Sequence, residues 1–251
     1  MTPGTTTSGN PTGDPRVGFV ITIDGPSGAG KSTTARAVAV RLAIPFLDTG
    51  ALYRAVAWKV IEEGVSPTDE VAVASCADHV QLHIAGAAHD THVFVNSRDV
   101  SREIRTPEVS ELSSRLAVQP LLRRRLVEVQ REIGRRGPVV AEGRDVGTVV
   151  FPDALVKVFL DADLDTRARR RARELQNRGI AMSLEDVRDD LARRDQRDRT
   201  RADSPLQRAP DAIVVDTTGM TLDTQVEAVL GVVRAHPASP EAWKSATREG
   251  A

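Results

Sequence analysis

The stretch GPSGAGKS, residues 25–32, contains three glycines and matches the spacing G-x-x-x-x-G-K-S with Gly25, Gly30, Lys31 and Ser32. Because glycine has no Cβ atom, consecutive N–H groups of such a loop can turn towards one anion. Lys31 would bring a full charge to the β- and γ-phosphates of a nucleotide, and the Ser32 hydroxyl could bind Mg²⁺. The sequence therefore predicts a nucleotide-binding phosphate loop. Its expected residues are Gly25, Pro26, Ser27, Gly28, Ala29, Gly30, Lys31, Ser32 and Thr33.

The segments on both sides of this loop are predicted to be a strand and a helix, as the motif requires. Val17–Ile23 is a short β-branched run and predicts a buried strand, and Lys31–Leu42 has helical periodicity. Alternating strands and helices favour a parallel sheet with crossover helices. The other predicted strands are residues 44–48, 137–143, 154–162 and 211–217, which makes about five core strands. The other predicted helices are Ala51–Glu62, Pro107–Leu116, Leu121–Ile133, Leu164–Gln176, Leu184–Arg194 and Leu222–Val233.

One region interrupts this α/β pattern. Residues 79–86 and 91–100 alternate apolar and polar side chains with a period of two, and a short Gly/Ala/His/Asp segment separates them. This pattern predicts an antiparallel hairpin inserted between the second predicted helix and the next pair of helices.

A second set of polar groups follows two of the predicted strands. The segment DTGALYR follows the second strand, and EGRDVG follows the third. In open α/β sheets, ligands bind at the carboxyl ends of strands, so Arg54 and Arg144 should face the same crevice as the phosphate loop. A phosphate-bearing second substrate would explain them. A guanine-specific switch is disfavoured, because the chain contains no Asn-Lys-x-Asp segment.

Residues 167–208 are crowded with arginines and interleaved aspartates. Such charge runs are usually solvated helix faces, and an RNA-binding surface is one alternative. Beside a phosphate loop, however, an arginine-rich mobile segment could close over the phosphates, neutralise charge and exclude water.

Several motifs together resemble bacterial cytidylate kinase, the CMP/dCMP kinase of the nucleoside monophosphate kinase group. They are ITIDGPSGAGKSTTA, FLDTGALYRAVA, SREIRTPEVS, EGRDVGTVVFPDA, KVFLDA and RRDQRDRTRADSPL, and the resemblance runs from about Val17 to Val233. It implies phosphorylation of CMP and dCMP by ATP and Mg²⁺, in pyrimidine nucleotide metabolism. It also implies a P-loop three-layer fold with a short helical LID, at about 167–205. The monophosphate-binding region would span about 49–136 and contain a β-rich insert at about 66–105.

The resemblance also implies roles for individual residues. Arg54, Arg144 and Arg201 would hold the CMP phosphate, whereas Ser114, Arg123 and Asp145 would read cytosine. The full set of expected CMP-binding residues is Thr49, Arg54, Ser114, Arg123, Arg144, Asp145, Arg194, Asp198 and Arg201. The residues expected to stabilise the transferred charge are Lys31, Arg144, Arg170, Arg194 and Arg197.

Two positions depart from the motifs of that family. Thr49 stands where serine is common, and it keeps the hydroxyl. Glu142 stands where aspartate is common, so the reach of its carboxylate differs, and we expect its replacement to change the rate only slightly. Asp48 and Glu142 are weaker candidates than Ser32 for binding Mg²⁺. Asp24 and Asp48 could each be a magnesium ligand or a strand-end cap.

The bulk composition favours an ordinary globular protein, with 40% hydrophobic residues and a net charge of −1. That charge gives no general attraction to nucleic acids or membranes, and no apolar run approaches the roughly 20 residues that cross a bilayer. A single cysteine suits a reducing compartment. We therefore expect a cytoplasmic protein, monomeric because no apolar patch is evident on a helix face or strand edge.

Both ends of the chain are rich in small and polar residues. We expect residues 1–16 and 236–251 to be disordered tails around a kinase domain of residues 17–235. Three other functions stay open at this point: a kinase of another acceptor such as AMP, UMP or shikimate, an RNA-binding protein, and a nucleotide-gated interaction module.

Overall fold

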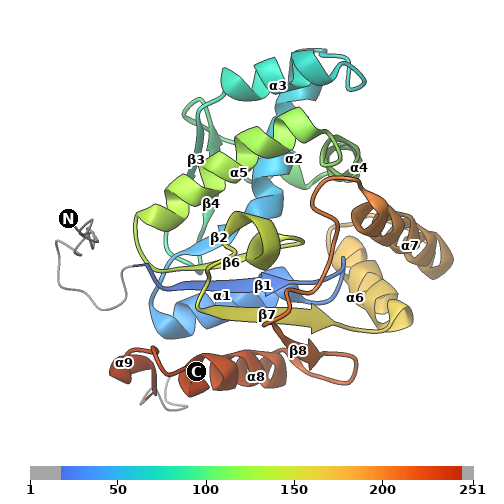
Figure 1. Ribbon diagram of the computed structural model, residues 1–251. Coiled ribbons are helices and arrows are strands. Elements are labelled where there is room, and N and C mark those ends of the chain that lie inside the picture. Colours follow the sequence, from blue (N-terminus) through green and yellow to red (C-terminus); the bar gives the residue numbers. More distant parts are fainter. Residues whose placement is uncertain (1–17, 245–251) are drawn as a thin grey trace, which may run out of the picture.

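A parallel sheet of five strands forms the centre of the molecule (Figure 1). The computed structural model describes residues 18–244, so the expected disorder of residues 1–16 lies outside the described residues. The strands follow the order β2-β6-β1-β7-β8, which confirms the predicted α/β fold. Their bounds are Val20–Asp24 (β1), Phe46–Asp48 (β2), Val139–Gly143 (β6), Val156–Asp161 (β7) and Ile213–Asp216 (β8).

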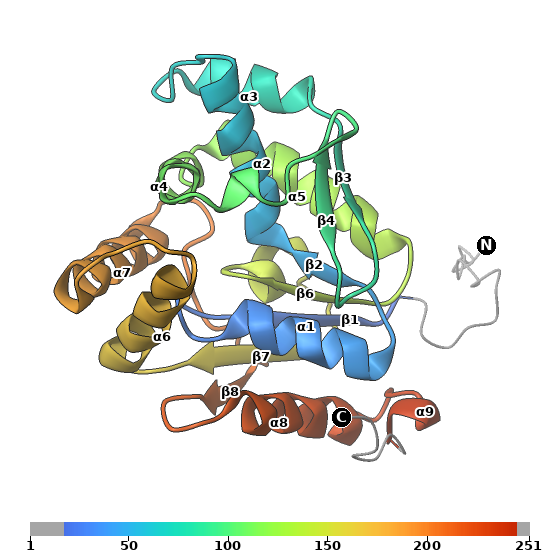
Figure 2. The same ribbon diagram turned by 180° about the vertical axis from the view of Figure 1, so that it is seen from behind.

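Helices cover both faces of this sheet and make the fold three-layered (Figures 1 and 2). Helices α1 (Lys31–Leu42) and α8 (Leu222–Ala235) pack on one face, and α2 (Thr49–Glu62) and α5 (Pro120–Arg135) pack on the other. Because both faces are buried, β1 is apolar or small at each position before its last residue. Ile21 and Ile23 contribute to the core beneath α1 and α8, whereas Val20 contributes to the opposite core.

A smaller layer lies on the α2 and α5 side of the sheet. Strands β3 (Leu82–Ala85) and β4 (His92–Val95) pair antiparallel as the predicted hairpin, and the two-residue strand β5 (Arg98–Asp99) joins them. A 3₁₀ turn, η1 (Glu103–Arg105), then leads into α4 (Pro107–Leu116).

The β-rich insert expected at about 66–105 begins with a helix that was not among the predicted elements. Residues Glu70–Asp78 form helix α3, whose first turn is capped by the Asp69 carboxylate accepting the N–H of Ala72. The buried side chains are Val73, Cys76 and Ala77, at helical spacing. This periodicity is short, and interleaved alanines and valines obscure it in the sequence.

The arginine-rich segment forms two helices beside the carboxyl ends of the strands (Figure 2). Helices α6 (Leu164–Asn177) and α7 (Leu184–Thr200) pack around a small core of their own, formed by Ala168, Leu175, Val187 and Leu191. Helix α7 continues beyond its predicted end at Arg194. The prediction ended too early because the last turns carry only charged and polar residues and show no apolar periodicity.

The predicted disorder of the C-terminal tail is wrong for residues 236–244. Helix α9 (Glu241–Lys244) folds back, and Trp243 is 3% exposed. Its ring meets the ring of Phe19 edge-on, with the centroids 4.8 Å apart. Burial of the Trp243 indole therefore holds this otherwise polar segment against the domain.

We predict that Trp243→Ala lowers the free energy of unfolding by about 3 kcal/mol, because it leaves a large cavity against Phe19. Urea unfolding would measure the loss. As a control, Lys244→Ala removes an exposed neighbour and should change stability by less than about 0.5 kcal/mol. Equal unfolding midpoints for Trp243→Ala and the unmodified protein would contradict this packing.

Candidate active site

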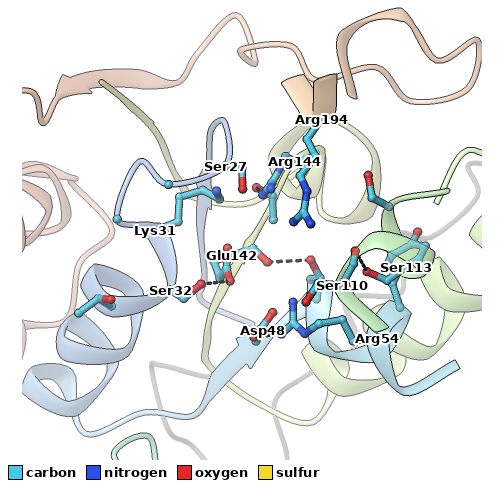
Figure 3. A pocket seen from close by; sticks show the side chains of 18 of the residues that line it. Ser27, Lys31, Ser32, Asp48, Arg54, Ser110, Ser113, Glu142, Arg144 and Arg194 are labelled. Atoms are coloured by element: carbon cyan, nitrogen blue, oxygen red, sulfur yellow. Dashed lines mark hydrogen bonds and ion pairs between the residues drawn. The ribbon is translucent and has the colours of Figure 1, made fainter. Parts of the chain in front are cut away.

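A cleft of about 780 Å³ opens at the carboxyl edge of the sheet (Figure 3). In the close view, Ser27, Lys31 and Ser32 lie on one side, Arg54, Ser110 and Ser113 lie on the other, and Glu142 and Arg144 lie between them. Eleven lining residues are lysine or arginine, and five are aspartate or glutamate. This excess of positive charge in a concave site favours a ligand with several negative charges.

The phosphate loop connects β1 to α1, as the motif predicts. Gly28 and Gly30 have φ angles of 78° and 93°, in the left-handed region that favours glycine. Gly30 directly precedes α1, so the positive end of that helix opens into the cleft. A Cβ atom at Gly28 would press against Arg167, the residue of α6 whose guanidinium donates to the carbonyl of Ser27.

Lys31 is a buried cation inside this loop, with 5% of its surface exposed. Its ammonium donates to the carbonyl of Pro26 at 2.7 Å. Burial lowers the pKa of Lys31 to about 7, and repulsion by Arg144 adds to this shift. An anion placed at the ammonium would restore its charged form, so the site is arranged to receive one.

Ser32 and Glu142 are in direct contact across the floor of the cleft. The Ser32 hydroxyl donates to Oε1 of Glu142 at 2.5 Å. Glu142 is 4% exposed, and burial raises its pKa, with the neighbouring Asp48 carboxylate adding to the rise. Strand pairing places the two carboxylates side by side, because Glu142 of β6 stands opposite Asp48 of β2. On its other side Glu142 stands opposite Ile23 of β1.

Asp48 is already committed to two partners. Its carboxylate accepts the N–H of Ala51, which caps α2, and it pairs with Arg54 at 2.7 Å. The carboxylate therefore orients an arginine towards the cleft, in addition to lying beside Glu142.

The end of β6 organises the other half of the cleft. Arg144 pairs with Asp198 of α7 at 2.8 Å. Asp145 pairs with Arg123 of α5 and, at 3.2 Å, with Arg201 at the end of α7. Two consecutive residues thus connect the sheet to α5 and to the arginine-rich helices. The Arg123 guanidinium also lies over the ring of Tyr53, 5.9 Å from its centroid.

Most of the predicted site residues line this one cleft. All nine expected CMP-binding residues do so: Thr49, Arg54, Ser114, Arg123, Arg144, Asp145, Arg194, Asp198 and Arg201. Lys31, Ser32, Thr33 and Arg170 line it too. Gly25, Pro26 and Ala29 do not line it. Pro26 and Ala29 are buried loop residues, and their carbonyls accept from Lys31 and Thr217.

Arg197 is not among the cleft-lining residues, although a role in catalysis was predicted for it. Its guanidinium holds both carboxylate oxygens of Glu111 on α4, at 2.8 and 3.0 Å. On α7, Arg194 and Asp198 line the cleft, whereas Arg197 binds α4 at its side. The sequence could not separate these arginines, because it shows no partner for any of them.

Sequence reasoning missed several polar lining residues, among them Arg36, Arg105 and Ser110. Helical spacing could have identified two of them. Arg36 follows Ser32 by four residues on α1, and Ser110 precedes Ser114 by four residues on α4, so each pair shares a helix face. Arg105 belongs to the motif SREIRTPEVS, which was used only for the resemblance.

The comparisons with known proteins agree with this geometry. A family profile described as cytidylate kinase matches residues 21–235. The cytidylate kinases of Carboxydothermus hydrogenoformans and Methylococcus capsulatus are each 46% identical to this chain; the alignments cover 85% and 86% of it and 96% and 97% of those proteins. The cytidylate kinase of Pasteurella multocida is 40% identical, over 87% of this chain and 96% of that protein.

A phosphate loop at the carboxyl edge of a parallel sheet, facing a second cationic half-site under arginine-rich helices, defines a P-loop kinase. The chain belongs to the cytidylate kinase family. It is therefore an enzyme of the transferase class that uses a nucleotide as phosphoryl donor.

The placement of α7 predicts different outcomes for two neighbouring arginines. Arg194→Ala removes a cation from the cleft and should lower kcat/KM about 100-fold. Arg197→Ala breaks a partly exposed ion pair with Glu111 and should cost at most about fivefold. Steady-state kinetics of the two variants would measure both effects. A loss at Arg197 as large as that at Arg194 would contradict the placement.

Proposed function

We propose that the protein transfers the γ-phosphoryl group of ATP to the 5′-phosphate of CMP or dCMP, giving ADP with CDP or dCDP. An oxygen of the acceptor phosphate forms the new P–O bond while the bond from the γ-phosphorus to the ADP oxygen breaks. One observation carries the proposal: the phosphate loop and the Arg144–Asp145 half-site share a single cleft. The names and identities of the relatives support the choice of acceptor.

Each half-site suits one of the two nucleotides. The loop around Lys31 would hold the ATP phosphates. On the other side, Arg54 and Arg144 would hold the CMP phosphate, joined by Arg201. Asp145 would accept from the exocyclic amine of cytosine, which uracil lacks.

The chain's own groups can account for the catalysis. The acceptor oxygen is already anionic, so no strong general base is needed. The cations of Lys31, Arg144, Arg170 and Arg194 would stabilise charge on the transferring phosphoryl group. Ion pairs between α7 and the rest of the cleft, such as Arg144–Asp198, would help the arginine-rich helices close and exclude water.

The oxygen groups of the cleft floor fit a magnesium ion, which would neutralise charge on the β- and γ-phosphates. Ser32 and Glu142 offer a hydroxyl and a carboxylate in contact, whereas Asp48 is engaged by Arg54. Among the described residues no cluster of three or more His, Cys, Asp or Glu side chains is arranged to hold a metal. The ATP phosphates would therefore supply the remaining ligands.

The hydrogen bond from Ser32 makes Glu142 a stronger candidate for binding Mg²⁺ than the sequence indicated. We predict that Glu142→Gln weakens the apparent affinity for Mg²⁺ about tenfold. Titration of MgCl₂ at fixed ATP and CMP would measure the change. Glu132→Gln, on the exposed surface of α5, is the matched control. An unchanged Mg²⁺ dependence in the Glu142 variant would exclude it from the metal site.

A panel of acceptors tests the proposed substrate. Coupled assays of ADP release should give a kcat/KM for CMP and dCMP at least about 100-fold above that for AMP, because Asp145 pairs with an amine that AMP presents elsewhere. Shikimate and UMP complete the panel. Preference for AMP or shikimate over CMP would overturn the choice of acceptor, and slow ATP hydrolysis independent of any acceptor would favour a nucleotide-gated module.

The arginine-rich helices are better explained by this cleft than by RNA. Several of their arginines already have acidic partners, including Arg167 with Asp195 and Arg188 with Asp165. We therefore propose small-molecule substrates and no nucleic-acid partner. We also propose a monomeric, cytoplasmic enzyme, as expected from the sequence. Of the helices between residues 18 and 244, none is long and apolar enough to cross a membrane.

A further inference from the structure

The carboxylate of Asp24 occupies an unusual place between the two halves of the cleft. Asp24 is the last residue of β1, directly precedes the phosphate loop and is 5% exposed. Its two oxygens accept the backbone N–H groups of Val146, at 2.9 Å, and Gly147, at 2.7 Å. One side chain therefore joins the start of the phosphate loop to a backbone segment more than 100 residues later in the chain.

This arrangement is costly for a carboxylate. Burial raises the pKa of Asp24 to about 6, although the two N–H groups oppose the rise. The Lys31 ammonium attracts it only through space and donates its hydrogen bond to the carbonyl of Pro26 instead. Burying a charge costs free energy unless the group is paired or hydrogen-bonded. The Asp24 carboxylate therefore depends on its two backbone hydrogen bonds.

The two N–H groups belong to the turn that begins directly after Arg144 and Asp145. Residues Val146–Val150 form a π-helical turn, closed by the Phe151 N–H donating to the carbonyl of Val146 at 2.7 Å. The fit is close, since a Cβ atom at Gly147 would lie 2.7 Å from the Thr22 hydroxyl. A shift of this turn would move both acceptor-site residues that precede it.

We propose that Asp24 is a positioning residue: it holds the Arg144–Asp145 dipeptide in register with the phosphate loop, so that acceptor and donor phosphates meet in line. This proposal rests on the function proposed above. It assigns Asp24 to the backbone turn and not to magnesium. Small displacements of positioned groups are known to cost large factors in rate, so the fixed register has a direct catalytic consequence.

The isosteric variant Asp24→Asn tests the assignment. Its single amide oxygen can accept from one N–H group, while its NH₂ group must face the other donor. The Val146 and Gly147 amides should then exchange with solvent at least about tenfold faster. We expect the KM for CMP to rise about tenfold and kcat to fall about tenfold, whereas the Kd for ATP alone stays within about threefold.

A control separates this role from a general structural one. Asp69→Asn changes a carboxylate that also serves a backbone N–H, on α3 outside the cleft, and should leave all these readouts unchanged. If Asp24→Asn does not fold, Asp24→Glu keeps both acceptors but displaces them by one methylene, and must show the same selective defect for CMP. Unchanged exchange, or equal losses of ATP and CMP binding, would overturn the proposal. An unmodified protein that fails to phosphorylate CMP would instead overturn the proposed function, and the exchange comparison would still test the geometry.

Discussion

The concentration of positive charge in one concave cleft is the constraint on which the rest of the site depends. Eleven basic side chains line it against five acidic ones, and one of them, Lys31, is so enclosed that burial lowers its pKa to about 7. Internal carboxylates offset part of the repulsion, as in the pairs Arg144–Asp198 and Arg123–Asp145. Substrate phosphates would offset the remainder, so the protein is built around ligands that carry several negative charges.

Parallel strand order explains how so many groups from distant parts of the chain meet. Strands β1, β2 and β6 are neighbours, and they end in Asp24, Asp48 and Gly143 at the same edge of the sheet. The phosphate loop leaves from β1, the Asp48–Arg54 pair follows β2, and the Arg144–Asp145 dipeptide follows β6. The sheet therefore fixes the distance between the phosphate loop and the proposed acceptor half-site, and Asp24 joins the end of β1 to the turn that follows β6.

Features set by local chemistry could be predicted from the sequence. The glycines of the phosphate loop, the strong periodicity of α5 and the Pro107 start of α4 each determine their own conformation. Family motifs added the cleft-lining residues of the proposed acceptor side, whose assignment needs no knowledge of their partners. These features make the fold class and most of the candidate site readable from sequence.

Features decided by long-range partners could not be predicted. Arg197 lies outside the cleft because it pairs with Glu111 of α4, and Trp243 is buried because it packs against Phe19. Helix α7 extends through polar turns that have no apolar period, and α3 hides its short periodicity among alanines. In each case the deciding group is far away in the sequence or the local signal is too short.

The central claim is that two nucleotides lie end to end in one cleft. The most direct test uses a single compound in which adenosine and cytidine are joined 5′ to 5′ through five phosphates. Calorimetry would measure its binding to the protein. The account predicts one molecule per chain, displacement of both ATP and CMP, and an affinity at least about 100-fold above that of either nucleotide alone. A compound that displaces ATP while CMP stays bound, or that binds no more tightly than ATP, would contradict it.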